Sequence, residues 1–88
     1  MSEPAAMEVE VLFFARAREL AGRDRARLGL RGGATVREAC AALAAAYPAL
    51  EKCLAASRIG VNEEFADPGA VIPAGAVLAV IPPVSGGV

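Results

Sequence analysis

The sequence contains no histidine, which is the commonest general acid or base in enzymes and the commonest protein ligand of metal ions. Its two cysteines, Cys40 and Cys53, are too few to form a zinc site. A chain of 88 residues buries only about 60 to 65% of its unfolded surface on folding, which leaves little material for a deep pocket. We therefore expect one domain that binds no metal and catalyses no reaction with its own side chains.

An excess of positive charge and a long apolar run are also lacking. The formal net charge is −1, which argues against a general binder of nucleic acids or anionic membranes. The longest apolar run, Ala39 to Ala46, is too short to cross a bilayer, and the first residues do not resemble a signal peptide. We therefore expect a cytoplasmic protein with reduced thiols and no membrane or nucleic-acid partner.

The N-terminal third has the period of β-strands. Apolar residues at 9, 11 and 13 predict a strand whose second face is partly apolar too, because Leu12 and Phe14 lie on it. Residues 25–31 alternate in the same way and predict a second strand, paired with the first as a wide hairpin. Between them, Arg16 to Leu20 is expected to form a helical turn that ends near Gly22.

A capping box marks the start of the main helix. The Thr35 hydroxyl is expected to accept a hydrogen bond from the Glu38 N–H, while the Glu38 carboxylate reaches back to Thr35. The helix that follows has one buried stripe, made of Val36, Cys40, Leu43, Tyr47 and Leu50. Pro48 is expected to end this helix near Tyr47, and Leu50 to Ala56 to add a further turn.

The C-terminal part predicts three more short elements. Arg58 to Asn62 has the composition of a strand, and Asn62 to Phe65 that of a turn or hairpin. Ala76 to Ile81 is apolar at every position, which is typical of a central strand covered on both faces. Turn residues separate the last two elements, at Asp67-Pro68-Gly69 and Pro73-Ala74-Gly75.

This order of strands around one helix predicts an α+β fold of the β-grasp type, in which a mixed sheet curls around the main helix. In that topology the first and last strands lie side by side in parallel. We expect residues 1–6 to be a flexible lead-in, residues 7–81 to be the β-grasp domain and residues 82–88 to be an extended tail.

The tail combines two prolines with a Gly-Gly pair. Pro82 and Pro83 fix φ and favour extended backbone, so the tail is expected to point away from the last strand. Gly86 and Gly87 have no Cβ and give the thinnest backbone available, which suits insertion into a narrow channel of another protein. The alternative, a Gly-rich terminus that is simply frayed, stays open at this point.

Two segments resemble the small subunit of molybdopterin synthase (the MoaD family). They are Val11-Leu12-Phe13-Phe14-Ala15-Arg16-Ala17-Arg18-Glu19-Leu20-Ala21-Gly22 and Ile81-Pro82-Pro83-Val84-Ser85-Gly86-Gly87. A Gly-Gly end alone is shared by ubiquitin and by the thiazole-pathway sulfur carrier, but the two segments together are specific. The resemblance spans roughly residues 7–87 and implies a ubiquitin-like sulfur carrier.

In that family an adenylating and sulfurating enzyme uses ATP and Mg²⁺ to convert the terminal glycine into a thiocarboxylate. The thiocarboxylate then enters the large subunit of molybdopterin synthase and gives its sulfur to a pyranopterin precursor of the molybdenum cofactor. The resemblance therefore implies a hetero-oligomer in which this chain is a non-catalytic subunit, binds no cofactor itself and contributes a reactive group and a docking surface.

The resemblance also assigns roles to residues. Gly87 would carry the sulfur, Gly86 would give the slender approach, and the extended guide on the partner would be made of Pro82, Pro83, Val84 and Ser85. Phe14 is the candidate partner-binding residue of the body. For Phe14 and Leu12 two interpretations stay open, namely packing of the second sheet face or an exposed apolar patch for the partner.

Val88 departs from the family pattern, because a thiocarboxylate forms only at a free carboxylate and that of Gly87 is here bonded to valine. The valine is removed by a peptidase, or it marks a boundary with a fused large-subunit domain, or the protein is inactive as written; we favour the first two. Two other functions stay open: a sulfur carrier for thiazole or tRNA thiolation, and a β-grasp interaction module with an inert tail.

Overall fold

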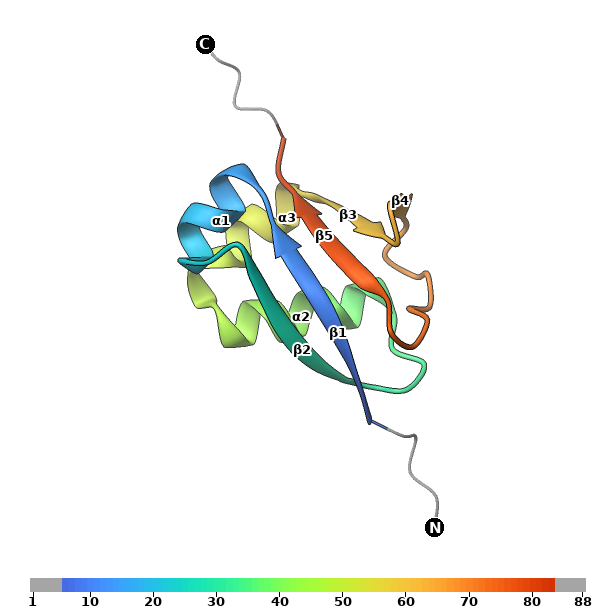
Figure 1. The fold of residues 1–88 in the computed structure, drawn as a ribbon. Coiled ribbons are helices and arrows are strands. Elements are labelled where there is room, and N and C mark those ends of the chain that lie inside the picture. Colours follow the sequence, from blue (N-terminus) through green and yellow to red (C-terminus); the bar gives the residue numbers. More distant parts are fainter. Residues whose placement is uncertain (1–5, 84–88) are drawn as a thin grey trace.

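The alternating residues of the N-terminal third form the hairpin from which the sheet is built (Figure 1). The structure is a computed structural model that describes residues 6–83. Its elements are β1 (Ala6–Phe13), α1 (Ala15–Ala21), β2 (Arg25–Arg31), α2 (Val36–Ala46), the 3₁₀ helix η1 (Pro48–Leu50), α3 (Glu51–Ala56), β3 (Arg58–Val61), β4 (Glu64–Ala66) and β5 (Val77–Ile81). Among residues 6–83 there is no helix with the length and apolar character needed to cross a membrane.

The β1–β2 hairpin has one buried and one exposed face, as predicted. β1 pairs with β2 in antiparallel register, and every second residue of β2, starting from Ala26, is buried. The helical turn between the two strands is α1, which is one residue longer at each end than expected. Gly22 ends it with a φ of 75°, the left-handed conformation that glycine adopts without a steric penalty.

The sheet has the strand order β2-β1-β5-β3-β4, which confirms the β-grasp prediction. β5 lies between β1 and β3 and runs parallel to β1, so the first and last strands are neighbours at the centre. β3 and β4 form a hairpin whose turn residues, Asn62 and Glu63, have φ values of 51° and 74°. Positive φ at both positions matches the right-handed twist of a two-residue hairpin.

The capping box at the start of α2 forms as predicted and gains an ion pair. The Glu38 N–H donates to Thr35 Oγ1 at 3.3 Å, and the Thr35 N–H donates to Glu38 Oε1 at 2.9 Å. Arg31 at the end of β2 donates two hydrogen bonds to the Glu38 carboxylate, at 2.8 and 2.7 Å. The hydrogen bond from Arg31, and then that from the Thr35 backbone, lower the pKa of Glu38 from 4.5 to about 2. One carboxylate thus joins β2 to the start of the main helix.

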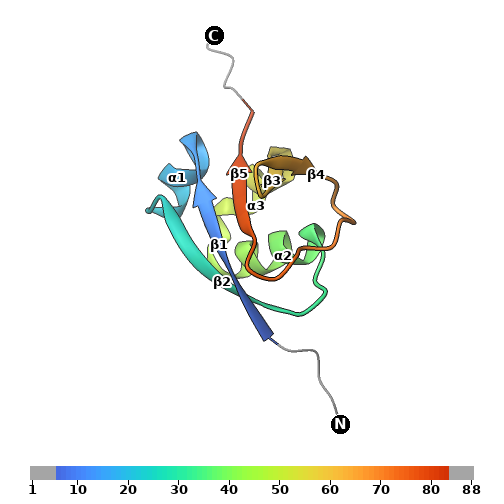
Figure 2. The same cartoon turned by 45° about the vertical axis from the view of Figure 1, so that its right-hand side comes forward.

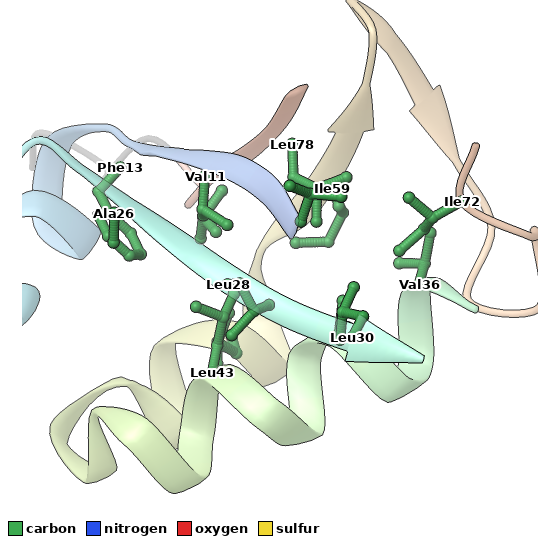
Figure 3. Close-up of a cluster of buried hydrophobic side chains, with 14 of the residues drawn as sticks. Val11, Phe13, Ala26, Leu28, Leu30, Val36, Leu43, Ile59, Ile72 and Leu78 are labelled. Carbon is green, nitrogen blue, oxygen red and sulfur yellow. The ribbon is translucent and has the colours of Figure 1, made fainter. Parts of the chain in front are cut away.

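The core lies between α2 and the sheet (Figure 3). Leu28 and Leu30 of β2 and Leu43 of α2 lie between the strand and the helix, with Leu28 beside Leu43, and all three are buried. The predicted buried stripe of α2 is confirmed only in part, because Val36 and Leu43 are buried but Cys40 and Tyr47 are half-buried. Leu50 is fully buried, but it lies in η1, since Pro48 ends α2 and starts a 3₁₀ turn. Burial raises the pKa of the Cys40 thiol.

The prediction that β5 is covered on both faces is wrong. Leu78 and Val80 are buried on the helix side, whereas Val77 is 36% exposed and Ala79 and Ile81 are only half-buried. The cause is that the helices described for residues 6–83 lie on one side of the sheet, so the opposite side has no second layer in the described chain (Figures 1 and 2). A central strand here is apolar on both faces although only one is covered.

The ion pair at the helix start generates a pH prediction. Glu38→Gln keeps a hydrogen-bond acceptor for Thr35 but removes the charge that faces Arg31. Because the pKa of Glu38 is lower in the folded protein, its stabilising effect is complete above pH 4.5 and is lost as the pH falls toward about 2. We expect the urea midpoint of the variant to lie below that of the wild type at neutral pH, and the difference to shrink between these two pH values.

The matched control is Glu19→Gln, which removes the same charge from the exposed pair of Arg16 and Glu19. Exposed i, i+3 pairs contribute little, so this variant should change the urea midpoint less. A Glu38→Gln effect of equal size at neutral pH and near pH 2 would contradict the assignment.

Candidate functional site

The tail leaves the sheet at the end of β5. The Phe14 N–H donates to the Val80 carbonyl at 3.3 Å, which is the last hydrogen bond between this end of β1 and β5. On the other side of β5, Ile81 is still paired with Arg58 of β3. Pro82 follows directly and has no N–H to continue the ladder, so pairing stops there. Pro82 is half-buried and Pro83 is exposed, and we call these two residues the tail root.

Of the predicted site residues, three lie within the described part of the chain. They are Phe14 and the two prolines of the tail root, and Phe14 is 45% exposed. The others, Val84, Ser85, Gly86 and Gly87, lie outside the described residues, as does Val88. The roles of all of them stay predictions. The structure brings Phe14 and the tail root to the same end of the sheet, because β1 and β5 are parallel.

The uncovered side of the sheet is apolar along a row that crosses four strands. Leu12 of β1 pairs with Ala79 of β5, Ala79 with Gly60 of β3, and Gly60 with Phe65 of β4. Residues that are paired across strands point to the same face. Val77 and Ile81, two residues before and after Ala79, also lie on this side.

Phe14 extends this surface beyond the end of β1. Its backbone remains extended, with φ −118° and ψ 151°, so it keeps the orientation of Leu12 two residues earlier. We define the outer apolar face by the residues Leu12, Phe14, Phe65, Val77, Ala79 and Ile81. Of the two interpretations of Phe14, the exposed patch is favoured, because the Phe14 side chain is 45% exposed and no second layer of the described chain covers it.

Phe65 is a member of the outer apolar face that the sequence analysis did not single out as a candidate, and the β5 members, Val77, Ala79 and Ile81, were expected to be covered. Phe65 was assigned to a turn or hairpin, and it lies in β4, the second strand of that hairpin, where it is 56% exposed. The guanidinium carbon of Arg58 lies 4.1 Å from the centre of the Phe65 ring, in a cation–π contact. The available signal was the apolar residue directly after the Asn62-Glu63 turn, at the position where a hairpin places its second strand.

The side chains described at this end of the sheet are mainly apolar. The buried core of residues 6–83 contains no polar or charged residue. In the same part of the chain no three histidine, cysteine, aspartate or glutamate side chains gather in a way that could hold a metal ion. An exposed apolar surface next to a chain exit is typical of a protein that docks on a partner.

Comparisons with known proteins agree with this geometry. The ThiS family matches residues 11–87. The molybdopterin synthase sulfur carrier subunit of Arabidopsis thaliana is 35% identical over 85 residues, which are 97% of this chain and 88% of that protein. The subunit of the same name from Chlamydomonas reinhardtii is 35% identical over 83 residues, which are 92% of this chain and 100% of that protein.

A solved structure supports the fold independently. SAMP1, the small archaeal modifier protein 1 of Haloferax volcanii, has a crystal structure that matches with a TM-score of 0.83 and 38% identity. The match covers 91% of this chain and 99% of that chain. The likeness therefore extends over the whole sheet and its helices.

Two adjacent phenylalanines test the assignment of the two faces. Phe13 is 2% exposed and packs edge-to-face on Tyr47 with ring centres 5.8 Å apart, whereas Phe14 points outward. We expect Phe13→Ala to lower the free energy of unfolding by about 3–5 kcal/mol. Phe14→Ala should lower it by less than about 1 kcal/mol, since the side chain is exposed. Urea unfolding measures both, and equal losses would show that Phe14 belongs to the core.

Proposed function

Because the chain belongs to the ThiS family, we propose that it is a sulfur carrier subunit that serves the synthesis of molybdopterin. The observation that carries the proposal is the 35% identity to the Arabidopsis thaliana sulfur carrier subunit over 97% of this chain. The exit of the tail root beside the outer apolar face supports it, because a carrier must present its end and a docking surface together. We place the reaction in the cytoplasm, where ATP and reduced thiols are available.

The proposed chemistry takes place on the carboxylate of Gly87, which becomes free when hydrolysis of the Gly87–Val88 peptide bond releases Val88. An adenylating enzyme transfers AMP from ATP to this carboxylate with the help of Mg²⁺ and releases pyrophosphate. Sulfur at the oxidation level of sulfide then displaces AMP and leaves a thiocarboxylate. Donation of that sulfur to a pyranopterin precursor, with water supplying an oxygen atom, regenerates the carboxylate. The chain itself supplies the acyl group, and ATP and Mg²⁺ are used by the partner.

Two partners follow from this chemistry, the adenylating enzyme and the large subunit of molybdopterin synthase. The name "subunit" in both plant and algal relatives supports an assembly with a large subunit. Catalytic acids and bases then belong to the partners, which is consistent with a chain that lacks histidine. The outer apolar face is the proposed docking surface, since its apolar side chains are left in water by the fold of residues 6–83.

A second candidate is a protein modifier. It is favoured by the 38% identity to SAMP1, a small archaeal modifier protein, over 91% of this chain. The two functions differ in the fate of the activated Gly87, because a modifier ends in an amide bond to another protein and a carrier ends in a thiocarboxylate. Immunoblots of the host under denaturing, reducing conditions distinguish them, since only a modifier gives conjugates of higher mass.

The role of Gly87 can be tested by intact mass. A chain that ends at Gly87 and the chain that ends at Val88 are each incubated with the adenylating enzyme, ATP, Mg²⁺ and a sulfur donor. We expect the mass of the first to increase by one oxygen-to-sulfur exchange and that of the second to stay unchanged, because only a free Gly87 carboxylate can be activated. Equal sulfur on both chains would refute the assignment.

Gly86 tests the need for a slender tail. We expect Gly86→Phe to leave the thermal unfolding midpoint unchanged, because residues 6–83 already form the closed core. Sulfur transfer to the pterin should fall by at least about tenfold, since an added side chain must be accommodated in the partner's channel. The control is Gly69→Phe, at a turn glycine with open space around it, which should transfer sulfur normally.

A further inference from the structure

A groove lies beside the tail root and is separate from the outer apolar face. It has a volume of about 1110 Å³ and lies between α1, η1 and α3. Most of its lining is apolar, and we call the lining residues Leu20, Ala49, Cys53 and Ala56 its floor. Pro82 and Pro83, the two residues of the tail root, also line it. None of the six residues of the outer apolar face takes part, so the tail root has a second surface on its other side.

The charged residues at the groove leave one cation without a partner. Arg16, Glu19 and Lys52 line the groove together with the apolar residues. Arg16 donates to Glu19 at 3.0 Å, so these two charges offset each other. Among the described residues, Lys52 has no carboxylate within salt-bridge distance, and its side chain is exposed. The groove therefore combines an apolar floor with a net positive charge.

We propose that this groove docks a segment of the synthase large subunit in which an apolar side chain lies next to a carboxylate. The proposal rests on the proposed function, because it takes the large subunit as the protein that receives the tail. A protein that encloses the tail beyond Pro83 must contact the tail root, and the tail root is part of the groove. Continuity with the inserted tail thus brings the groove into the same interface.

The chemistry of the occupant follows from the groove itself. An apolar side chain gains free energy by covering the alanine floor, and small floor residues leave room for it. A neighbouring carboxylate would pair with Lys52, and this attraction accelerates association. A partner with a cation at the same place would be repelled by Lys52. The outer apolar face has its own cation, Arg58, which keeps its charge while its guanidinium lies over the Phe65 ring. Lys52 adds a separate positive charge on the groove side of the tail root.

Two pairs of variants test the proposal. Ala56→Phe fills the floor, and its control Ala55→Phe adds the same ring at the neighbouring exposed position, which lines a different depression beside α2. Lys52→Glu reverses the free charge, and its control Arg37→Glu makes an equal change in net charge outside the groove. All four positions are exposed, and thermal unfolding checks that each variant is folded.

The dissociation constant for the large subunit, measured by calorimetry, is the readout. We expect Ala56→Phe and Lys52→Glu to weaken binding by at least about tenfold. The two controls should stay within about twofold of the wild type, as distant surface substitutions do. Lys52→Arg keeps the charge and should retain most of the affinity, and the effect of Lys52→Glu should shrink at high salt.

Sulfur loading of the chain that ends at Gly87, measured separately, distinguishes failure of this proposal from failure of the proposed function. If the chain that ends at Gly87 acquires sulfur but Ala56→Phe and Lys52→Glu bind the large subunit normally, the groove proposal is overturned and the function stands. If the variants lose binding while no sulfur is ever acquired, the function fails and the groove proposal stands.

The same variants also distinguish other possible occupants of the groove from the large subunit. A loss of affinity only for the adenylating enzyme would assign the groove to that protein and overturn the proposal. Light scattering of the isolated protein covers the remaining case, since a wild-type dimer that Ala56→Phe converts to a monomer would assign the groove to a second copy of this chain.

Discussion

The parallel contact between β1 and β5 is the interaction on which the rest of the structure depends. It joins segments that are more than sixty residues apart, with Val11 opposite Leu78 and Phe13 opposite Val80, and all four side chains are buried. Because the strands are parallel, both finish at the same end of the sheet, and Phe14 therefore lies near the tail root. The burial that stabilises the fold therefore also fixes where the functional end of the chain emerges.

One-sided coverage is the second consequence of this architecture. The helices described here lie on one side of the sheet, and parallel neighbours such as β1 and β5 are usually covered on both sides. The apolar residues on the other side of β5 contribute little to the free energy of unfolding while water covers them. They become favourable when another protein excludes that water. The core contact explains the apolar residues on one face of β5, and the proposed docking of a partner on the outer apolar face would explain those on the other.

Most features that the sequence predicted are encoded by residues close to one another along the chain, and the exception, the parallel pairing of β1 and β5, was predicted from the order of the elements. The capping box of Thr35 and Glu38, the alternation of β2 and the stop at Gly22 all depend on neighbours within a few positions. The outer apolar face was only partly predicted, because Phe65 joins Ala79 through the register of β3, which no local pattern specifies. The groove was not foreseen for the same reason, because its lining comes from α1, from the η1–α3 segment and from the tail root. The φ of 51° at Ala15 was equally unpredictable, since alanine rarely adopts this conformation.

The position of the groove beside the tail root matters for how a sulfur carrier moves from one partner to the next. Two enzymes that accept the same tail exclude each other, so each complex must dissociate before the next one forms. The outer apolar face, through its apolar side chains, favours contact with several partners but distinguishes poorly between them. Selectivity then has to come from surfaces next to the tail root that differ in shape and charge, and the groove with Lys52 is such a surface.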